Sequence, residues 1–209
     1  MKENAYFPCF LYRRTGSMVC REKLFLENFH WYLDLDNSYH IEFVVAELNR
    51  ITDKHLSALQ HIPEADFDYK YSPRKWSKRE ILGHLVDSAQ NNIRRFIVAQ
   101  YEEQPNIVYD QDKWVAITDY QHYSMPDLIG LWYLLNKHIC HILRSITPEM
   151  AERKSESEEM HTVGWLAEDY IKHLLHHLHQ VLDLEPVAYP WIMPCRQKIN
   201  GINFYTTIF

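Results

Sequence analysis

The sequence WSKREI at residues 76–81 has the features of a strong helix start. Ser77 is suited to cap the helix, Glu80 completes a capping box, and Trp76 and Ile81 form a hydrophobic staple. Downstream, apolar residues recur on one stripe, which consists of Leu82, Leu85, Ala89, Ile93 and Phe96. This periodicity predicts an amphipathic helix that runs to about Tyr101.

Three further segments show the same helical periodicity. One runs from Ile41 and closes before Pro63, a second fits residues 126–146, and a third begins near Thr162 and ends at Pro186. No alternating strand pattern competes with these helices. We therefore expect an all-α protein whose core is a four-helix bundle.

The connections between these helices suggest a topology. Residues 102–124 contain Pro105 and several aromatic side chains, which is typical of an ordered crossover. The shorter links on either side favour antiparallel neighbours, whereas the crossover allows the second and third helices to run parallel. The expected order is up-down-down-up, with residues 1–37 as an irregular N-terminal extension, 38–186 as the bundle, and 187–209 as a C-terminal extension.

Composition excludes several classes of function. The 209 residues are 46% apolar and carry 22 basic against 28 acidic side chains, a net charge of −6. The chain has no net positive charge to attract a phosphate backbone, so we expect no nucleic-acid partner. There are five glycines and no GxGxxG or GxxxxGK[ST] string, which argues against a nucleotide-binding loop.

Cysteine usage and hydropathy suggest a cytoplasmic protein. The four cysteines lie far apart and form no CxxC pair, so neither a disulfide framework nor a zinc ribbon is indicated. The first apolar run is short, contains Pro8, and lacks the cleavage site of a signal peptide. A membrane association is therefore not expected.

Four of the 13 histidines fall in one seven-residue window, where an even spread would place fewer than one. They are His173, His176, His177 and His179. On a helix, His173 and His177 project from adjacent turns of one face, so that two imidazoles can reach one ion. A solvated polar face that happens to use histidine is the alternative interpretation.

A third ligand has to come from another segment, and His84 is the best candidate. If the second and fourth helices are antiparallel and flush, His84 lies at the level of His173 and His177 within about one turn. On a helical wheel, however, His84 lies beside Glu80 and Asp87, away from the apolar stripe. The sequence alone therefore also allows exposure of His84 to solvent.

Two strings resemble the DinB/YfiT-like family of metalloenzymes. They are GHLVDS at residues 83–88, shortly after Trp76-Ser77, and DYIKHLLHH at residues 169–177. The resemblance covers about residues 40–184. It implies an up-down-down-up four-helix bundle with three metal-binding histidines, which in this sequence are His84, His173 and His177.

Three neutral imidazoles leave an ion with open coordination positions, as in catalytic sites, and suit Zn²⁺ or Ni²⁺. Asp87 and Asp169 lie one turn from His84 and His173, so either could orient the second ring nitrogen of a ligand. Ordinary solvated helix charge is the alternative for both.

The YfiT-like resemblance implies transfer of a low-molecular-weight thiol, such as bacillithiol, onto an electrophilic small molecule in detoxification or stress. The expected partners are therefore a small thiol and an electrophile, with a homodimer as a further expectation. A metal-dependent hydrolase and a non-catalytic metal-binding bundle are the two alternatives.

Overall fold

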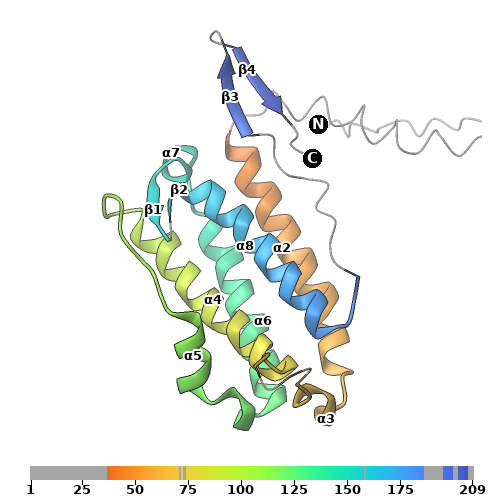
Figure 1. Ribbon diagram of the computed structural model, residues 1–209. Coiled ribbons are helices and arrows are strands. Elements are labelled where there is room, and N and C mark those ends of the chain that lie inside the picture. The colour runs from red at the N-terminus through yellow and green to blue at the C-terminus, as the bar shows by residue number, and fades with distance from the viewer. Residues whose placement is uncertain are drawn as a thin grey trace, which may run out of the picture. The chain divides into compact units, whose positions relative to one another are not determined.

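A computed structural model describes residues 37–70, 72, 74–157, 159–185, 195–199 and 202–206, with side chains described from residue 41 to residue 185. Four long helices form the bundle (Figure 1): α2 (Asn37–Gln60), α4 (Lys78–Val98), α6 (Met125–Leu143) and α8 (Val163–Val181). The prediction of an all-α four-helix bundle is confirmed.

Contacts between side chains define how the helices run. Helices α4 and α8 are antiparallel, because Lys78 at the start of α4 pairs with Asp183 just beyond the end of α8. Helices α2 and α6 are antiparallel as well, since Lys137 pairs with Asp53, and Cys140 reaches back to the carbonyl of Val45. Helices α4 and α6 run side by side in the same direction (Figure 1). The expected up-down-down-up order is confirmed.

The predicted start of the second helix is present in detail. The Ser77 hydroxyl accepts a hydrogen bond from the backbone N–H of Glu80, and the Glu80 carboxylate accepts one from the backbone N–H of Ser77. The predicted stripe faces the core, where Leu82, Leu85, Ala89 and Phe96 are fully buried. Local capping and hydrophobic patterning therefore place α4 as expected.

The helices joined by the two outer links do not pack as neighbours, contrary to expectation. Helix α2 and helix α4 each pack chiefly against α6 and α8, so consecutive helices α2 and α4 lie across the diagonal of the bundle. The links, residues 61–77 and 144–162, are long enough for this path and contain short helices of their own: α3 (Glu64–Phe67) and α7 (Pro148–Ala151).

The crossover is ordered, as predicted, but it contains helical turns that the sequence reading did not assign. These are α5 (Gln111–Thr118) and a 3₁₀ turn, η2 (Tyr120–His122). Several side chains of α4 hold the crossover in place: the Arg95 guanidinium donates to the carbonyl of Ile107, and Arg79 donates to that of Tyr123. The crossover is therefore part of the packed structure rather than a free linker.

Short strands also form where no strand was expected. In the link between α6 and α8, β1 (Lys154–Glu156) pairs antiparallel with β2 (Met160–Thr162). Near the C-terminus, β3 (Cys195–Ile199) pairs with β4 (Ile202–Thr206). Three-residue strands lack room for a visible alternation, so periodicity could not reveal the first pair. The expected N-terminal extension lies outside the described residues, apart from Asn37.

None of the helices in the described part of the chain is both long and apolar enough to span a bilayer.

Candidate metal centre

Two antiparallel helices bring three histidines together. His84 lies in the second turn of α4, and His173 and His177 lie on successive turns of α8. The three ring centroids are 4.6 to 5.0 Å apart. The three rings lie close together because the start of α4 is level with the end of α8. This alignment brings His84 to the same height in the bundle as His173 and His177.

The nitrogen atoms of His84 and His173 are spaced as metal ligands require, and a nitrogen of His177 lies nearby. Nε2 of His84 and Nε2 of His173 are 3.0 Å apart, and one ligand atom from each of the three histidines lies within 4.8 Å of the others. Two nitrogens bound to one zinc ion at tetrahedral or octahedral angles are about 3.0 to 3.4 Å apart. The His84–His173 pair already has this spacing, and His177 would complete a three-nitrogen face by bringing its ligand atom closer to them.

Burial keeps these imidazoles neutral. His84 is 1% exposed, and burial lowers its pKa to about 4, with the charge of His177 as a smaller cause. Burial and the neighbouring histidines lower the pKa of His173 to about 3, and burial also lowers the pKa of His177. Only a neutral imidazole can donate a lone pair to a cation, so at neutral pH all three are in the form that binds metal. The exposed alternative for His84 is thus excluded.

The other two histidines of the cluster on α8 do not join the site. His176 is exposed, and its ring contacts His177 and the Gln180 amide. His179 lies against the backbone carbonyl of Glu185. Of the four histidines in this window, the structure thus brings His173 and His177, which are four residues apart, together with His84.

Neighbouring side chains fix the rings. The Ser88 hydroxyl is 3.4 Å from Nδ1 of His173, Gln180 Oε1 is 2.9 Å from Nδ1 of His177, and Trp76 packs against the His84 ring at 4.9 Å between centroids. Sequence reasoning had missed Ser88 and Gln180 in this role. Gln180 follows His177 by three residues, and Ser88 faces His173 from the neighbouring helix α4. Polar residues at such positions are common in helices, so the sequence alone could not single them out.

Among the described side chains, neither of the two predicted orienting carboxylates is hydrogen-bonded to a histidine. Asp87 is 1% exposed and accepts a hydrogen bond of 2.5 Å from the hydroxyl of Tyr120, not from a histidine. Asp169 is half-buried and, within the described side chains, makes no hydrogen bond to His173; burial raises its pKa. Asp87 is therefore a buried, hydrogen-bonded carboxylate, so the alternative of a solvated helix charge does not hold for it. Burial raises its pKa to about 6.

Tyr120 is the residue near the site that sequence reasoning missed. Its ring lies so close to α4 that a Cβ atom on Gly83 would be 2.2 Å from a ring carbon. Gly83 in the interior of a helix costs about 1 kcal/mol relative to alanine, which was the available signal that another group approaches there. The tyrosine itself comes from η2 and could not be paired with Gly83 from sequence.

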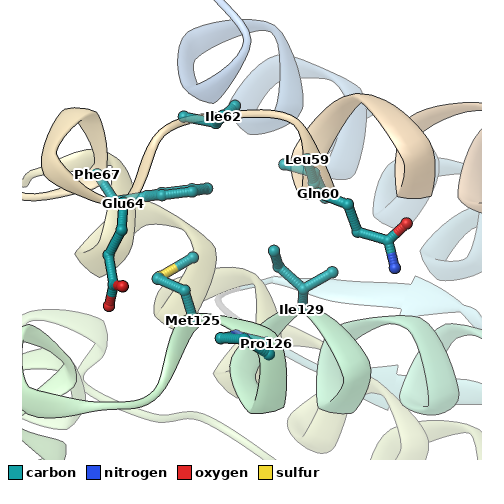
Figure 2. Close-up of a pocket in the computed structure, with 8 residues that line it drawn as sticks. All are labelled: Leu59, Gln60, Ile62, Glu64, Phe67, Met125, Pro126 and Ile129. Atoms are coloured by element: carbon teal, nitrogen blue, oxygen red, sulfur yellow. The ribbon is translucent and has the colours of Figure 1, made fainter.

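A separate hollow of about 220 Å³ lies between the end of α2, α3 and the start of α6. Figure 2 shows its walls, which are mainly apolar side chains such as Leu59, Phe67 and Met125, with Ile62 and Ile129 beside them. None of the three clustered histidines lines it. It is smaller than the roughly 300 to 1,000 Å³ of typical small-molecule sites, so we assign it no role.

Comparison with known proteins places the chain in a family. The sequence profile of the DinB superfamily matches residues 47–181, which is well over half of the chain and includes all three clustered histidines. The chain belongs to the DinB superfamily. The resemblance noted from the two histidine strings is thereby confirmed.

Two relatives share the name "Putative metal-dependent hydrolase". A relative from Oceanobacillus iheyensis is 32% identical over 122 residues, covering 56% of this chain and 69% of its own. YfiT from Bacillus subtilis is 25% identical over 141 residues, covering 66% of this chain and 79% of its own. Proteins similar to this one are therefore named for a metal-dependent activity.

A solved structure supports the fold. YfiT from Bacillus subtilis, described as "a probable metal-dependent hydrolase with an unusual four-helix bundle topology", aligns with a TM-score of 0.63 at 23% identity. The alignment covers 68% of this chain and 84% of YfiT. At that identity the likeness concerns the fold alone.

Proposed function

We propose that this DinB-superfamily protein is a metal-dependent transferase that moves a low-molecular-weight thiol onto an electrophilic small molecule. The observation that carries the proposal is the convergence of His84, His173 and His177 as neutral imidazoles. All three ligands are nitrogen atoms, which suits Zn²⁺ or Ni²⁺ rather than Mg²⁺ or Ca²⁺. A metal so held supplies Lewis acidity, which lowers the pKa of a thiol or water that it binds.

The protein residues contribute orientation and a low-dielectric surrounding. Trp76 packs against the His84 ring, and Ser88 and Gln180 contact the outer nitrogens of His173 and His177. These contacts limit rotation of the rings, so the three nitrogens keep facing the same point. Three protein ligands leave coordination positions for a nucleophile, which is typical of catalytic rather than structural sites.

The transfer reaction has a simple balance. The thiolate sulfur attacks the electrophilic carbon, a C–S bond forms, and the bond from that carbon to the leaving group breaks. The leaving group departs with the bonding electron pair, and the thiol proton passes to solvent. Oxidants and reductants are not required.

Hydrolysis is the second candidate, and the names of the relatives favour it. The same centre would then activate water instead of a thiol, and the bond to the leaving group would break in the same manner. The two activities share the centre and differ only in the nucleophile, so a direct comparison of nucleophiles decides between them.

The experiment uses untagged, full-length protein loaded with one equivalent of Zn²⁺ or Ni²⁺. Consumption of cysteine, glutathione and bacillithiol is measured with 1-chloro-2,4-dinitrobenzene, and hydrolysis is measured with p-nitrophenyl acetate in the absence of thiol. The transferase proposal requires a thiol-dependent rate that His173→Ala/His177→Ala abolishes. A metal-dependent rate confined to the ester would overturn it in favour of hydrolysis, and the lack of both rates would leave a non-catalytic metal-binding bundle.

A further inference from the structure

Two buried polar atoms beside the histidine cluster have no hydrogen-bond partner among the described residues. They are Nδ1 of His84 and Oδ2 of Asp87. The two residues are three positions apart on α4, where side chains are neighbours with Cβ atoms about 5 to 6 Å apart. An unpaired buried polar atom costs about 1 to 3 kcal/mol, so two of them on one helical turn require an explanation.

The two atoms are chemically complementary once a cation occupies the cluster. Nε2 of His84 faces Nε2 of His173 and is the atom directed at the candidate site. A neutral imidazole that binds a cation through Nε2 must carry its proton on Nδ1. His84 then presents a buried donor that lacks an acceptor, and Asp87 presents a buried acceptor that lacks a donor.

Tyr120 binds the other oxygen of the Asp87 carboxylate, Oδ1. Its hydroxyl donates to Oδ1 of Asp87 at 2.5 Å, and the tyrosine is only 2% exposed. The ring lies directly on α4 at Gly83, where only a residue without a Cβ leaves enough space. With Oδ1 occupied in this way, Oδ2 is the oxygen that remains available to His84.

We propose that Asp87 and Tyr120 are positioning residues of the metal centre: Tyr120 anchors Oδ1 of Asp87 so that Oδ2 accepts the Nδ1–H of His84 when a cation is bound. The proposal rests on the proposed function only in requiring that a cation binds the three histidines. Neither residue touches the ion or a substrate. Tyr120 acts on the centre from the crossover, through two hydrogen bonds in series.

The test measures Zn²⁺ affinity of the full-length chain by competition with a chromophoric chelator at pH 7.5. Tyr120→Phe removes only the hydroxyl and keeps the ring on Gly83, and Asp87→Ala removes the carboxylate. Loss of an outer-shell partner typically weakens metal affinity by about 10- to 100-fold, and we expect this for both variants. Because Tyr120 acts through Asp87, adding Tyr120→Phe to Asp87→Ala should weaken affinity by less than a further 2-fold, well below the estimate of about 10-fold for an independent contact.

Tyr170→Phe is the matched control. Tyr170 is also a buried tyrosine whose hydroxyl donates to a side chain, Asn136, at 2.7 Å, but among the described residues its hydroxyl is not hydrogen-bonded to the histidine cluster. It should keep the wild-type Zn²⁺ affinity even if the variant is less stable. Equal losses of affinity in Tyr120→Phe and Tyr170→Phe would indicate general destabilisation and overturn the proposal.

A spectroscopic signature provides a second readout. In ¹⁵N-labelled, zinc-loaded protein, the Nδ1 proton of His84 should be protected from exchange and shifted downfield by its carboxylate acceptor, and both features should disappear in Asp87→Ala. Wild-type Zn²⁺ binding with unchanged affinity in both variants would overturn this proposal and leave the three-histidine centre intact. Failure of the wild-type chain to bind Zn²⁺ would instead overturn the proposed function.

Discussion

Nε2 of His84 lies 3.0 Å from Nε2 of His173, although 89 positions separate the two residues in the chain. The contact crosses the interface of α4 and α8. His84 is buried and His173 is half-buried, and the lowered pKa values keep both rings neutral, so a cation between the two nitrogens would be bound by lone pairs that already face the same point.

Each of the three clustered histidines should be required for metal binding. In separate His84→Ala, His173→Ala and His177→Ala variants, we expect Zn²⁺ affinity to fall by more than about 100-fold, beyond the effect of losing an outer-shell partner. His176→Ala is the matched control, because His176 lies on the same helix next to His177 but is exposed. Isothermal titration calorimetry measures the four affinities. A wild-type affinity in any of the first three variants would remove that histidine from the ligand set.

The metal-free protein should lose stability as the pH falls from 6 to 4. The pKa values of about 4 for His84 and about 3 for His173 lie below the unfolded value near 6.5, so in this range the unfolded state binds two more protons on these residues. Asp87 opposes this by one proton, because its pKa is raised to about 6 in the native state. The net proton makes the free energy of unfolding fall by about 1.4 kcal/mol per pH unit.

Urea unfolding in EDTA at pH 4, 5, 6 and 7 measures this dependence. The lowered pKa of His177 acts in the same direction and steepens it. His173→Gln, which cannot titrate, should flatten the profile by the contribution of one proton. A profile that stays the same in His173→Gln would show that His173 is protonated in the native state at these pH values.

Gly83→Ala should destabilise the protein. The added Cβ would lie 2.2 to 2.6 Å from three carbons of the Tyr120 ring, so the ring or the helix has to move. Overpacking of this kind lowers the free energy of unfolding by about 1 to 3 kcal/mol. Replacing glycine by alanine in a helix raises it by about 1 kcal/mol, so we expect a net loss of stability. Gly130→Ala on α6 is the control, since no atom lies within 4 Å of its Cβ position. It should stabilise the protein, and urea unfolding distinguishes the two signs.

Removal of the α4 cap should cost more than removal of the α8 cap. Ser77 accepts from the Glu80 backbone N–H and also from the Gln121 amide at 2.6 Å, which fastens the crossover to the helix start. Thr162 caps α8 through a single bond to the backbone N–H of Trp165. We expect Ser77→Ala to cost about 2 kcal/mol and Thr162→Ala about 1 kcal/mol in urea unfolding. The reverse order would show that the Gln121 contact contributes nothing to stability.

Much of the bundle follows from local sequence signals. The capping box at Ser77 and the apolar stripe of α4 each depend on residues that are close together in the sequence. Both features can therefore be predicted without knowledge of the rest of the chain. The spacing of His173 and His177 belongs to the same kind of signal, because one helix fixes their separation. The burial of His84 does not, since it depends on α8 covering a face that looks polar on the wheel.

The features that sequence reasoning missed depend on contacts between distant segments. Tyr120 in the crossover is hydrogen-bonded to Asp87 on α4, 33 positions away in the chain. No local sequence pattern around either residue indicates this contact. The placement of α2 opposite α4 depends on which faces of all four helices fit together, which loop length alone does not determine. The hairpin of β1 and β2 is held in part by pairing of Glu156 with residues next to Asn106, far away in the chain.

The diagonal placement of consecutive helices has a consequence for how this chain acquires its structure. The first half of the bundle sequence, α2 with α4, contains no well-packed helix pair, so its apolar stripes find no packing partner until α6 has been synthesised. A nascent chain that ends before residue 125 would therefore lack the helix against which both α2 and α4 pack most extensively. High average sequence separation between contacting residues also predicts slower refolding than that of a simple up-down bundle of the same length.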